Sequence, residues 1–341
     1  MEEDDLESRI AAYLDQQMPD ARNVAVTGLS RIYGGSSQET YRYHAAWGEG
    51  SDRREGDFIL RRDAAAGLVV AERDLEFTVY SALAGQPLPL PRVHFLELDT
   101  RWLDRPFFIM DLCPGRPGNP FDPNDPYEGN DASVARDFWT HLGTLAAIDH
   151  RAVGLEGLRN GAATGGFWQA ELDRWEAILD EGETVIEPIV RGAIRWLRRN
   201  PPPEASKPAI VHGDYRSGNF LFTPEDGRVS ALLDWEMCHI GDPLEDIAWA
   251  IDPFWPITRH MPLEDGLAIW EAASGLAVDR TALDWWRLFA CVKACAIWTT
   301  AEASVASGES YEMIVALSGI RAGHFHRKQI LAQMKALGAI A

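Results

Sequence analysis

Three polar residues in the middle of the chain have the types and spacing that phosphoryl transfer requires. Asp214 is followed five positions later by Asn219, and Asp234 comes fifteen positions after that. In transfer from a nucleotide, one carboxylate orients the acceptor hydroxyl, while an amide oxygen and a second carboxylate hold Mg²⁺ against the phosphates. Gly213 and Gly218 allow the backbone around the first two residues to turn tightly. The set therefore predicts a site in which Asp214 acts on the hydroxyl and Asn219 and Asp234 bind the metal.

The two motifs that carry these residues read His212-Gly-Asp-x-x-x-x-Asn219 and Asp234-Trp-Glu236. They resemble motifs of the aminoglycoside phosphotransferase and choline kinase family. The similarity continues through residues 241–249 to a subgroup whose kinase-like domains are joined to some acyl-CoA dehydrogenases. The resemblance implies an α+β, two-lobed, protein-kinase-like fold with a five-stranded antiparallel N-lobe and a mainly helical C-lobe. It also implies ATP and Mg²⁺ as cofactors and a small-molecule hydroxyl as acceptor, whose identity it does not fix.

The elements that must position these residues are visible in the periodicity of the apolar side chains. Apolar residues at helical spacing predict helices at 3–18 and 75–83. Strand-like patterns occur five times before residue 113, at 24–33, 39–47, 57–62, 92–98 and 106–112. The remainder is predicted to be mainly helical, apart from strands around 208–234. We therefore expect a nucleotide-binding lobe at 1–112 and a catalytic and acceptor-binding lobe at 113–341.

Two backbone segments of the first lobe are expected to bind the nucleotide. Between the first two strands lie four small residues whose N–H groups can approach phosphates: Gly34, Gly35, Ser36 and Ser37. The plainer alternative for these residues is a hairpin turn. In kinase-like folds the adenine ring binds main-chain groups at the end of the last strand of this lobe, which here is a Pro/Gly-rich stretch beginning at Met110. The resemblance therefore assigns main-chain contacts with adenine to Asp111 and Cys113.

The lysine that kinase-like enzymes place on the third strand is absent, because the chain has no lysine before Lys207. Strand alternation makes Arg61 the residue in its place, and Arg keeps the charge while offering a forked set of donors to phosphate. Its carboxylate partner is expected to be Glu76 on the following helix, with Glu72 one turn earlier as the alternative. The other interpretation of Arg61 is an exposed, merely basic strand end.

Three further residues are expected to support the reaction centre. Arg216 stands two positions after Asp214, where a cation would counter the charge on the transferring phosphoryl group; a surface ion pair is the alternative. His212 is expected to order the loop by hydrogen bonding, since the adjacent carboxylate already serves the hydroxyl. In the wider fold an Asp near this part of the chain braces the catalytic loop, and the resemblance assigns that role to Asp246.

The composition argues against some partners. The chain of 341 residues has 32 Lys and Arg against 52 Asp and Glu, a formal charge of −20, which disfavours nucleic acid or an anionic membrane as a partner. No apolar run approaches the length of a membrane span, and the acidic start of the chain is unlike a signal peptide. The four cysteines lack paired metal-ligand spacing. We expect a cytoplasmic protein, and the sequence does not indicate its oligomeric state.

The acceptor side is the least determined part of the site. Six tryptophans of the second lobe could form an aromatic box for a cationic group or simply pack the core: Trp249, Trp255, Trp270, Trp285, Trp286 and Trp298. The leading hypothesis is an ATP- and Mg²⁺-dependent kinase for a small-molecule hydroxyl, with a hydroxy acid, an acyl derivative or an amino alcohol as acceptor. The alternatives are a true aminoglycoside-resistance kinase and, because of the missing lysine, a nucleotide-binding pseudokinase with a regulatory role.

Overall fold

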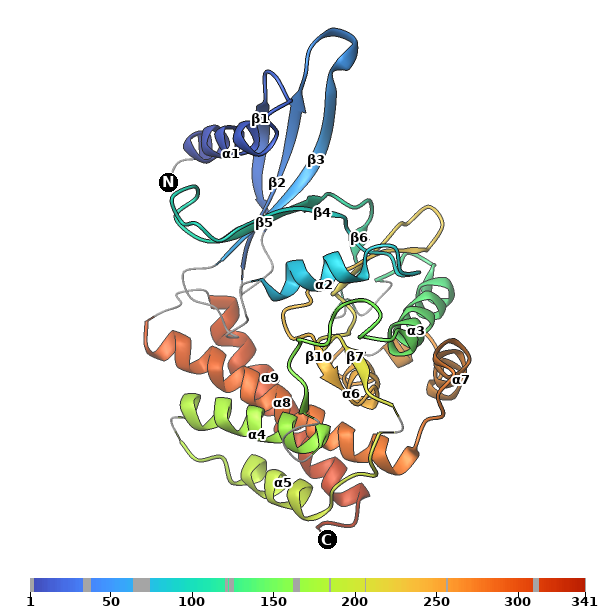
Figure 1. Ribbon diagram of the computed structural model, residues 1–341. Helices are drawn as coiled ribbons and strands as arrows, with labels where there is room; N and C mark the ends of the chain where they lie inside the picture. Colours follow the sequence, from blue (N-terminus) through green and yellow to red (C-terminus); the bar gives the residue numbers. More distant parts are fainter. Residues whose placement is uncertain are drawn as a thin grey trace. The chain divides into compact units, whose positions relative to one another are not determined.

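The chain divides into two units by its internal contacts (Figure 1). The structure is a computed structural model, and it describes residues 3–32, 38–63, 74–119, 122, 126–161, 166–183, 185–205, 207–255, 257–308 and 313–340. Unit 1 comprises Met1–Ala84 and Leu90–Cys113, and unit 2 comprises Gly85–Pro89 and Pro114–Ala341. Residues 85–89, which the expected division placed in the first lobe, group with unit 2.

Unit 1 is built on a five-stranded antiparallel sheet with the strand order β1-β2-β3-β5-β4. Its strands are β1 Ala25–Ile32, β2 Gln38–Trp47, β3 Arg54–Asp63, β4 Val93–Glu97 and β5 Phe107–Asp111. The helix α1, Glu3–Gln17, packs against β1, and the helix α2, Leu75–Leu83, contacts β4 (Figure 1). A short 3-10 helix, Gly50–Asp52, lies between β2 and β3.

Period-2 alternation explains why β2 forms a strand with one buried face. Tyr41, Tyr43 and Ala45 are buried and belong to the same apolar cluster as residues of α1. From α1, Tyr13 packs edge-on against Phe107 of β5, with ring centroids 4.9 Å apart. Burial of each large apolar side chain stabilises the unit by about 1.5–3 kcal/mol. This cluster fixes α1 against the sheet.

The pairing of β2 with β3 is longer than expected. It runs from Gln38 opposite Asp63 to Trp47 opposite Arg54, whereas β3 pairs with β5 only between Phe58 and Arg62. The first residues of β3 therefore form a two-stranded extension, drawn as the long hairpin of Figure 1. In β3 this extension carries three charged, exposed residues, Arg54, Glu55 and Asp57, so it lacks the apolar alternation by which the start of a strand is recognised.

Unit 2 is mainly helical. Its helices are α3 Asp131–Ala147, α4 Phe167–Gly182, α5 Pro188–Arg199, α6 Leu244–Ala250, the 3-10 helix Ile257–Arg259, α7 Leu263–Ser274, α8 Arg280–Ala306 and α9 Met313–Ala336. One small antiparallel sheet has the strand order β6-β8-β9, with bounds Arg116–Pro117, Phe220–Phe222 and Val229–Leu232. A second pairs β7, Ala209–Val211, with β10, His239–Gly241. The expected α+β fold, with a five-stranded antiparallel sheet and a mainly helical remainder, is confirmed.

The helix α8 is the central helix of unit 2, in contact with α4, α5, α6 and α9 (Figure 1). The side chain of Asp279 caps its start by accepting from the N–H groups of Thr281 and Ala282. Contrary to expectation, α8 is long and apolar enough, by length and composition alone, to cross a membrane; 61% of its most apolar stretch is buried inside the structure. Packing on several sides accounts for a helix that is apolar almost all round.

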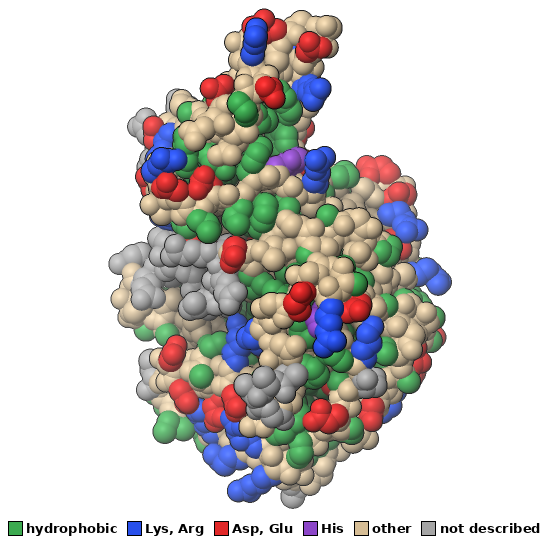
Figure 2. All heavy atoms as spheres, in the orientation of Figure 1, with side chains coloured by type: hydrophobic (Ala, Val, Ile, Leu, Met, Phe, Trp, Pro, Cys, Tyr) green, Lys and Arg blue, Asp and Glu red, His purple; other side chains and the backbone are tan. Residues whose placement is uncertain are grey.

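The high net acidity does not gather into one patch on the face shown in Figure 2. Acidic and basic side chains alternate there, with apolar side chains between them. On this face the charges therefore resemble an ordinary solvated surface, without a single-sign field.

Candidate active site

The loop between β7 and β8 carries the first predicted motif, and it is braced from α6. The carboxylate of Asp246 accepts from the main-chain N–H of His212 at 2.7 Å and of Gly213 at 2.9 Å. Gly213 has φ +85°, and a Cβ there would lie 2.5 Å from the carbonyl oxygen of Met237. Burial raises the pKa of Asp246 to about 6. The hydrogen bonds confirm the predicted bracing role of Asp246.

His212 ties the loop to the segment that follows β9. Its Nε2 lies 2.9 Å from the carbonyl oxygen of Leu233, which can only accept, and its Nδ1 lies 3.2 Å from the N–H of Asp214, which can only donate. These partners fit the neutral ring with its proton on Nε2. Burial lowers the pKa of His212 to about 4, which favours the same form. The contacts agree with a His that orders the loop.

Three donors hold the carboxylate of Asp214, which is 6% exposed. Oδ1 accepts from Nε1 of Trp249 at 2.6 Å and from Nε of Arg216 at 2.9 Å. Oδ2 accepts from Nδ2 of Asn219 at 2.5 Å, and the same nitrogen contacts the carbonyl oxygen of Asp214 at 2.9 Å. The side chain is therefore fixed in one orientation. A carboxylate held in a fixed orientation suits a residue that orients a hydroxyl and takes its proton late.

The two predicted metal ligands have properties that fit Mg²⁺. Because Nδ2 of Asn219 is committed to Asp214, its Oδ1 is the amide atom that could coordinate a metal. Asp234 follows β9 with φ +71°, in the left-handed region that non-glycine residues adopt rarely and often at functional sites. The main chain joins the two segments, since the N–H of Leu233 donates to the carbonyl oxygen of Asn219 at 2.9 Å. Both side chains offer the hard oxygen atoms that Mg²⁺ prefers; the metal role stays a prediction.

Arg216 pairs with the carboxylate of Asp214, the predicted base or hydroxyl-orienting residue. Besides the bond to Asp214, its Nη1 donates to the carbonyl oxygen of Ser217 at 3.2 Å. Its guanidinium lies over the ring of Trp255, 5.3 Å from the centroid, and its side chain is 27% exposed. This placement leaves Arg216 partly accessible beside the reaction centre.

Five of the six tryptophans divide into two groups, and Trp298 belongs to neither. Trp249 donates a hydrogen bond to the carboxylate of Asp214. Trp255 lies next to it, with its ring against the guanidinium of Arg216. Trp270, Trp285 and Trp286 are buried and pack the core, the plainer of the two predicted roles. Trp298 is half-buried, and its Nε1 donates to Nδ1 of His326 at 3.0 Å.

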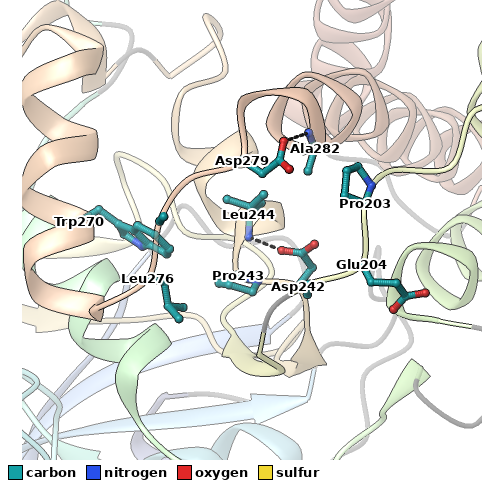
Figure 3. A pocket seen from close by; sticks show the side chains of 11 residues that line it. Pro203, Glu204, Asp242, Pro243, Leu244, Trp270, Leu276, Asp279 and Ala282 are labelled. Atoms are coloured by element: carbon teal, nitrogen blue, oxygen red, sulfur yellow. Dashed lines mark hydrogen bonds between the residues drawn. The ribbon is translucent and has the colours of Figure 1, made fainter.

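One pocket of unit 2, about 140 Å³ in volume, is lined by none of the predicted catalytic, nucleotide-binding or metal-binding residues. Figure 3 shows Asp242, Asp279, Glu204 and Trp270 around it. Asp242 accepts from the N–H of Leu244 at 2.9 Å and from Nε1 of Trp286 at 3.0 Å, so it anchors the start of α6. Burial raises the pKa of Asp242 to about 6. Its two carboxylate oxygens already have structural partners.

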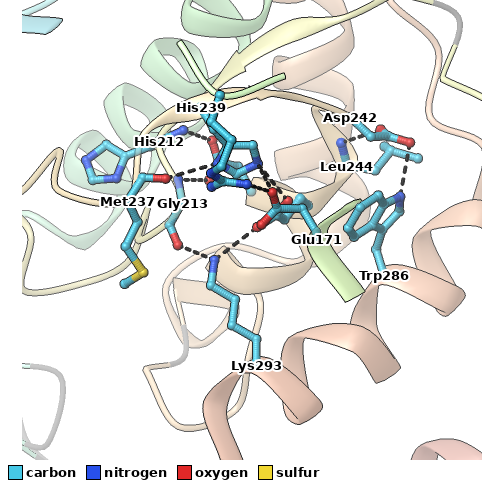
Figure 4. Close-up of polar contacts among 12 residues, drawn as sticks. Glu171, His212, Gly213, Met237, His239, Asp242, Leu244, Trp286 and Lys293 are labelled. Carbon is cyan, nitrogen blue, oxygen red and sulfur yellow. Dashed lines mark hydrogen bonds and ion pairs between the residues drawn. The ribbon is translucent and has the colours of Figure 1, made fainter. Parts of the chain in front are cut away.

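A buried group of charged residues lies beneath the loop, and the sequence analysis did not foresee it (Figure 4). Nζ of Lys293, on α8, donates to the carbonyl oxygen of Gly213 at 2.5 Å and to Oε1 of Glu245 at 3.0 Å. Oε2 of Glu245 faces Nε2 of His239 at 3.1 Å. Burial alone would raise the pKa of Glu245, but the neighbouring charge of Lys293 and the contact with His239 lower it. The only sequence signal was a lysine within the apolar stretch of α8.

This group contains three residues with the types and proximity of metal ligands. One donor atom each of Glu171, His239 and Glu245 lies within 4.8 Å of the others. The carboxylates already have cations, however: Arg159 pairs with Glu171, and Lys293 pairs with Glu245. A divalent ion would add two uncompensated charges to a buried place, which is unfavourable. The group is therefore a structural ion-pair network.

In unit 1 the predicted partner of Arg61 is confirmed. Nη1 of Arg61 lies 3.1 Å from Oε1 of Glu76, and their side chains are only 12% and 3% exposed. Gln38 joins the pair: its Oε1 accepts from Nε of Arg61 at 2.7 Å, and its Nε2 donates to Oε2 of Glu76 at 3.3 Å. Arg62 instead pairs with Glu39. Arg61 is thus a positioned cation and not an exposed strand end; its contact with a nucleotide stays a prediction.

The predicted adenine-binding segment begins where β5 ends, at Asp111. The N–H of Asp111 donates to the carbonyl oxygen of Arg92 at 2.9 Å, and its Oδ1 lies 2.6 Å from Nε2 of His94. The predicted contacts with adenine would use the carbonyl of Asp111 and the main chain of Cys113, and they stay a prediction. Burial raises the pKa of the Cys113 thiol to about 11, so the side chain is neutral at pH 7. Gly34, Gly35, Ser36, Ser37 and Glu72 lie outside the described residues.

Known proteins share this sequence pattern and this fold. Acyl-CoA dehydrogenase family member 11 of Gallus gallus is 32% identical over 209 residues, covering 60% of this chain and 26% of that protein. Its Rattus norvegicus counterpart is 25% identical over 287 residues, covering 81% and 35%. This chain thus spans about a quarter to a third of the length of these relatives. Viomycin phosphotransferase of Streptomyces vinaceus is 29% identical over 150 residues, covering 42% and 48%.

Solved structures agree in fold. An aminoglycoside phosphotransferase candidate from Ralstonia eutropha has a TM-score of 0.74 at 22% identity, covering 95% of this chain and 98% of that one. A mutant of aminoglycoside phosphotransferase APH(4)-Ia, solved with ADP and hygromycin B, has a TM-score of 0.60 at 16% identity, covering 96% and 98%. The family model described as "Phosphotransferase enzyme family" matches residues 28–286. With the matched region covering most of the chain and including the motifs around Asp214 and Asp234, the chain belongs to the phosphotransferase enzyme family.

Proposed function

We propose that the protein is an ATP- and Mg²⁺-dependent kinase that phosphorylates a hydroxyl group of a small molecule. The observation that carries the proposal is the arrangement of three polar residues in unit 2. Three donors, one of them Asn219, hold the carboxylate of Asp214 in one orientation. Asp234 has a left-handed backbone conformation. A protein that had lost catalysis would not be expected to retain all three groups together. The Arg61–Glu76 ion pair in unit 1 supports the same conclusion, because it keeps the cation–carboxylate pair that kinase-like enzymes require.

In the proposed reaction the acceptor hydroxyl oxygen bonds to the γ-phosphorus while the bond from that phosphorus to the bridging oxygen of ADP breaks. Asp214 orients the hydroxyl and receives its proton. Asn219 through Oδ1 and Asp234 through its carboxylate would hold Mg²⁺, which neutralises charge on the phosphate oxygens. Arg216 adds a positive charge beside the transferring group, and Arg61 contacts the nucleotide phosphates.

For the acceptor we propose a hydroxy acid or an acyl derivative of one, with amino alcohols next. The support is the match to proteins named for acyl-CoA dehydrogenases, which extends over most of this chain. The match to viomycin phosphotransferase supports the second candidate, a resistance kinase, but it covers less than half of the chain.

The test measures ADP release from Mg–ATP by the wild type and by Asp214→Asn in the presence of acceptor pools. The pools contain hydroxy acids and their CoA esters, amino alcohols, aminoglycosides, and sugars. We expect one pool to stimulate the wild type and not Asp214→Asn. Asp226→Asn is the matched control, since this Asp lies in an exposed turn of the same segment and, within the described part of the chain, its carboxylate accepts from Thr223 and from the N–H of Arg228. Binding of Mg–ATP without turnover in any pool would instead favour the pseudokinase.

A further inference from the structure

The two oxygens of the Asp214 carboxylate have unequal surroundings. Oδ1 accepts from both Trp249 Nε1 and Arg216 Nε, at 2.6 and 2.9 Å, which fills its two lone-pair directions. Oδ2 accepts only from Asn219 Nδ2 among the residues that the structure describes, at 2.5 Å. A carboxylate with one filled oxygen has its remaining acceptor direction on the other. An incoming hydroxyl therefore finds its partner at Oδ2.

The indole of Trp249 is built into its position more firmly than the other donor to Oδ1. The residue is 2% exposed, whereas the side chain of Arg216 is 27% exposed. Nε1 of Trp255 donates to the carbonyl oxygen of Trp249 at 2.6 Å, and the two rings lie 4.7 Å apart. On α8, Nζ of Lys293 lies 4.8 Å from the centroid of the Trp249 ring. A cation over an indole face draws electron density from the ring, which makes its N–H a stronger donor.

We propose that Trp249 is the positioning residue of the catalytic carboxylate. By filling Oδ1 together with Arg216, its indole N–H turns Oδ2 toward the acceptor hydroxyl. The proposal rests on the proposed kinase function and adds to it the atom of Asp214 that receives the hydroxyl. Without the indole donor, the carboxylate can rotate so that Oδ1 and Oδ2 exchange partners, and the hydroxyl loses a fixed acceptor. A misplaced reacting group of this kind lowers turnover without weakening nucleotide binding.

The hydrogen bond itself can be tested without any turnover. With ¹⁵N-labelled indoles, Trp249→Phe identifies the Trp249 signal among those of the 13 tryptophans. We expect that signal to move in Asp214→Asn, because the indole N–H then faces a neutral amide instead of a charged carboxylate. A Trp249 signal at the same place in both proteins would overturn the proposal, whether or not an acceptor has been found.

The positioning role is tested by replacing Trp249 with benzothienylalanine, which keeps the shape of indole but has sulfur in place of the N–H. We expect kcat to fall about 10- to 100-fold, the value of a hydrogen bond to a charged group, with KM for Mg–ATP unchanged. Trp249→Phe should show the same separation of kcat from KM. Because the isostere preserves packing, the Tm of this variant should stay close to that of the wild type. If Trp249 had only a structural role, turnover would fall only together with stability.

Trp286 provides a matched control. Its Nε1 donates to a buried carboxylate in the same way, 3.0 Å from Oδ2 of Asp242, and it is equally buried. Benzothienylalanine at this position should leave kcat within about threefold of the wild type. An equal loss of kcat at both positions, or none at Trp249, would overturn the proposal. Failure of the proposed function is distinct, because it appears as absent ADP release by the wild type in every acceptor pool.

Discussion

Replacing Lys293 by Met is expected to destabilise unit 2 by about 3–5 kcal/mol, the effect of removing one partner of a buried ion pair. The side chain of Lys293 is 1% exposed and that of Glu245 is 2% exposed, and Nζ lies 3.0 Å from the carboxylate. The substitution also leaves the carbonyl oxygen of Gly213 without the donor that lies at 2.5 Å. Met is similar in length, so it can still pack against the rings of Trp175 and Trp249 that Nζ contacts, although the cation–π attraction is lost with the charge. The loss therefore reports on charge more than on volume.

Two further measurements separate the parts of this effect. Adding Glu245→Gln to Lys293→Met removes the uncompensated charge, and the double variant should recover at least half of the lost free energy of unfolding. His239, 3.1 Å from Glu245, is not expected to replace the lost cation, because burial lowers the pKa of its ring below the ordinary value. The loss in Lys293→Met should therefore be similar at pH 7 and at pH 8.

The assay is urea unfolding followed by tryptophan fluorescence, which reports mainly on unit 2 because only Trp47 and Trp102 belong to unit 1. Lys207→Met is the control, since Nζ of Lys207 also donates to a main-chain carbonyl, that of Ala147 at 3.0 Å, but in an exposed place. The control should change the free energy of unfolding by less than about 1 kcal/mol. An equally small change in Lys293→Met would refute the reasoning, because it would show that Glu245 does not need this cation.

Three other outcomes follow from the geometry. Gly213→Ala should lower the free energy of unfolding by at least about 1–3 kcal/mol and abolish ADP release, because φ is +85° and Met237 obstructs a Cβ. Gly192 is the control, since it lies in a helix and a Cβ there would meet nothing within 4 Å. Gly192→Ala should stabilise the protein by about 0.5–1 kcal/mol in the same urea assay. Arg61→Ala should weaken Mg–ATP binding at least tenfold by calorimetry, with Arg61→Lys closer to the wild type; unchanged affinity in Arg61→Ala would remove it from the nucleotide site. Burial raises the pKa of Asp246 from 3.8 to about 6, so the folded state binds the proton of this carboxyl group more tightly than the unfolded state does. The contribution of Asp246 to the free energy of unfolding therefore falls by up to about 3 kcal/mol as pH rises from about 4 to 6. Asp246→Asn should reduce that slope in unfolding curves recorded between pH 4 and 7, and an unchanged slope would contradict the assignment.

The residues that sequence reasoning identified correctly depend on local patterns. Strand alternation selected Arg61, helical spacing selected Glu76, and the two facing elements bring the side chains together. For Asp246 it was the resemblance to the wider fold that implied a brace for the loop, which the hydrogen bonds to His212 and Gly213 confirm. For Arg61 and Glu76 the residue type and its neighbours in the chain restrict the possible partners to a few.

The contacts that it missed depend on packing between distant segments. Trp249 reaches Asp214 across 35 positions, and Lys293 reaches Gly213 across 80. Nothing near Trp249 distinguishes an indole that binds a carboxylate from one that fills the core, as Trp270 does. The apolar character of α8 indicated packing, but the partners of its buried lysine are set only when the helices of unit 2 associate.

The bracing of the catalytic loop from α6 and α8 has a consequence for the order of events during synthesis. The loop precedes both helices in the chain, so a growing polypeptide contains Gly213 long before Lys293 is made. At about 5–20 residues per second, the interval of 80 residues lasts about 4–16 s, and more residues must follow before α8 leaves the ribosome. We predict that ribosome-bound chains stalled before residue 280 are cut by protease within the loop, whereas released full-length chains are protected there; equal protection would contradict this order. The centre that transfers phosphate would then be among the last parts of unit 2 to become ordered.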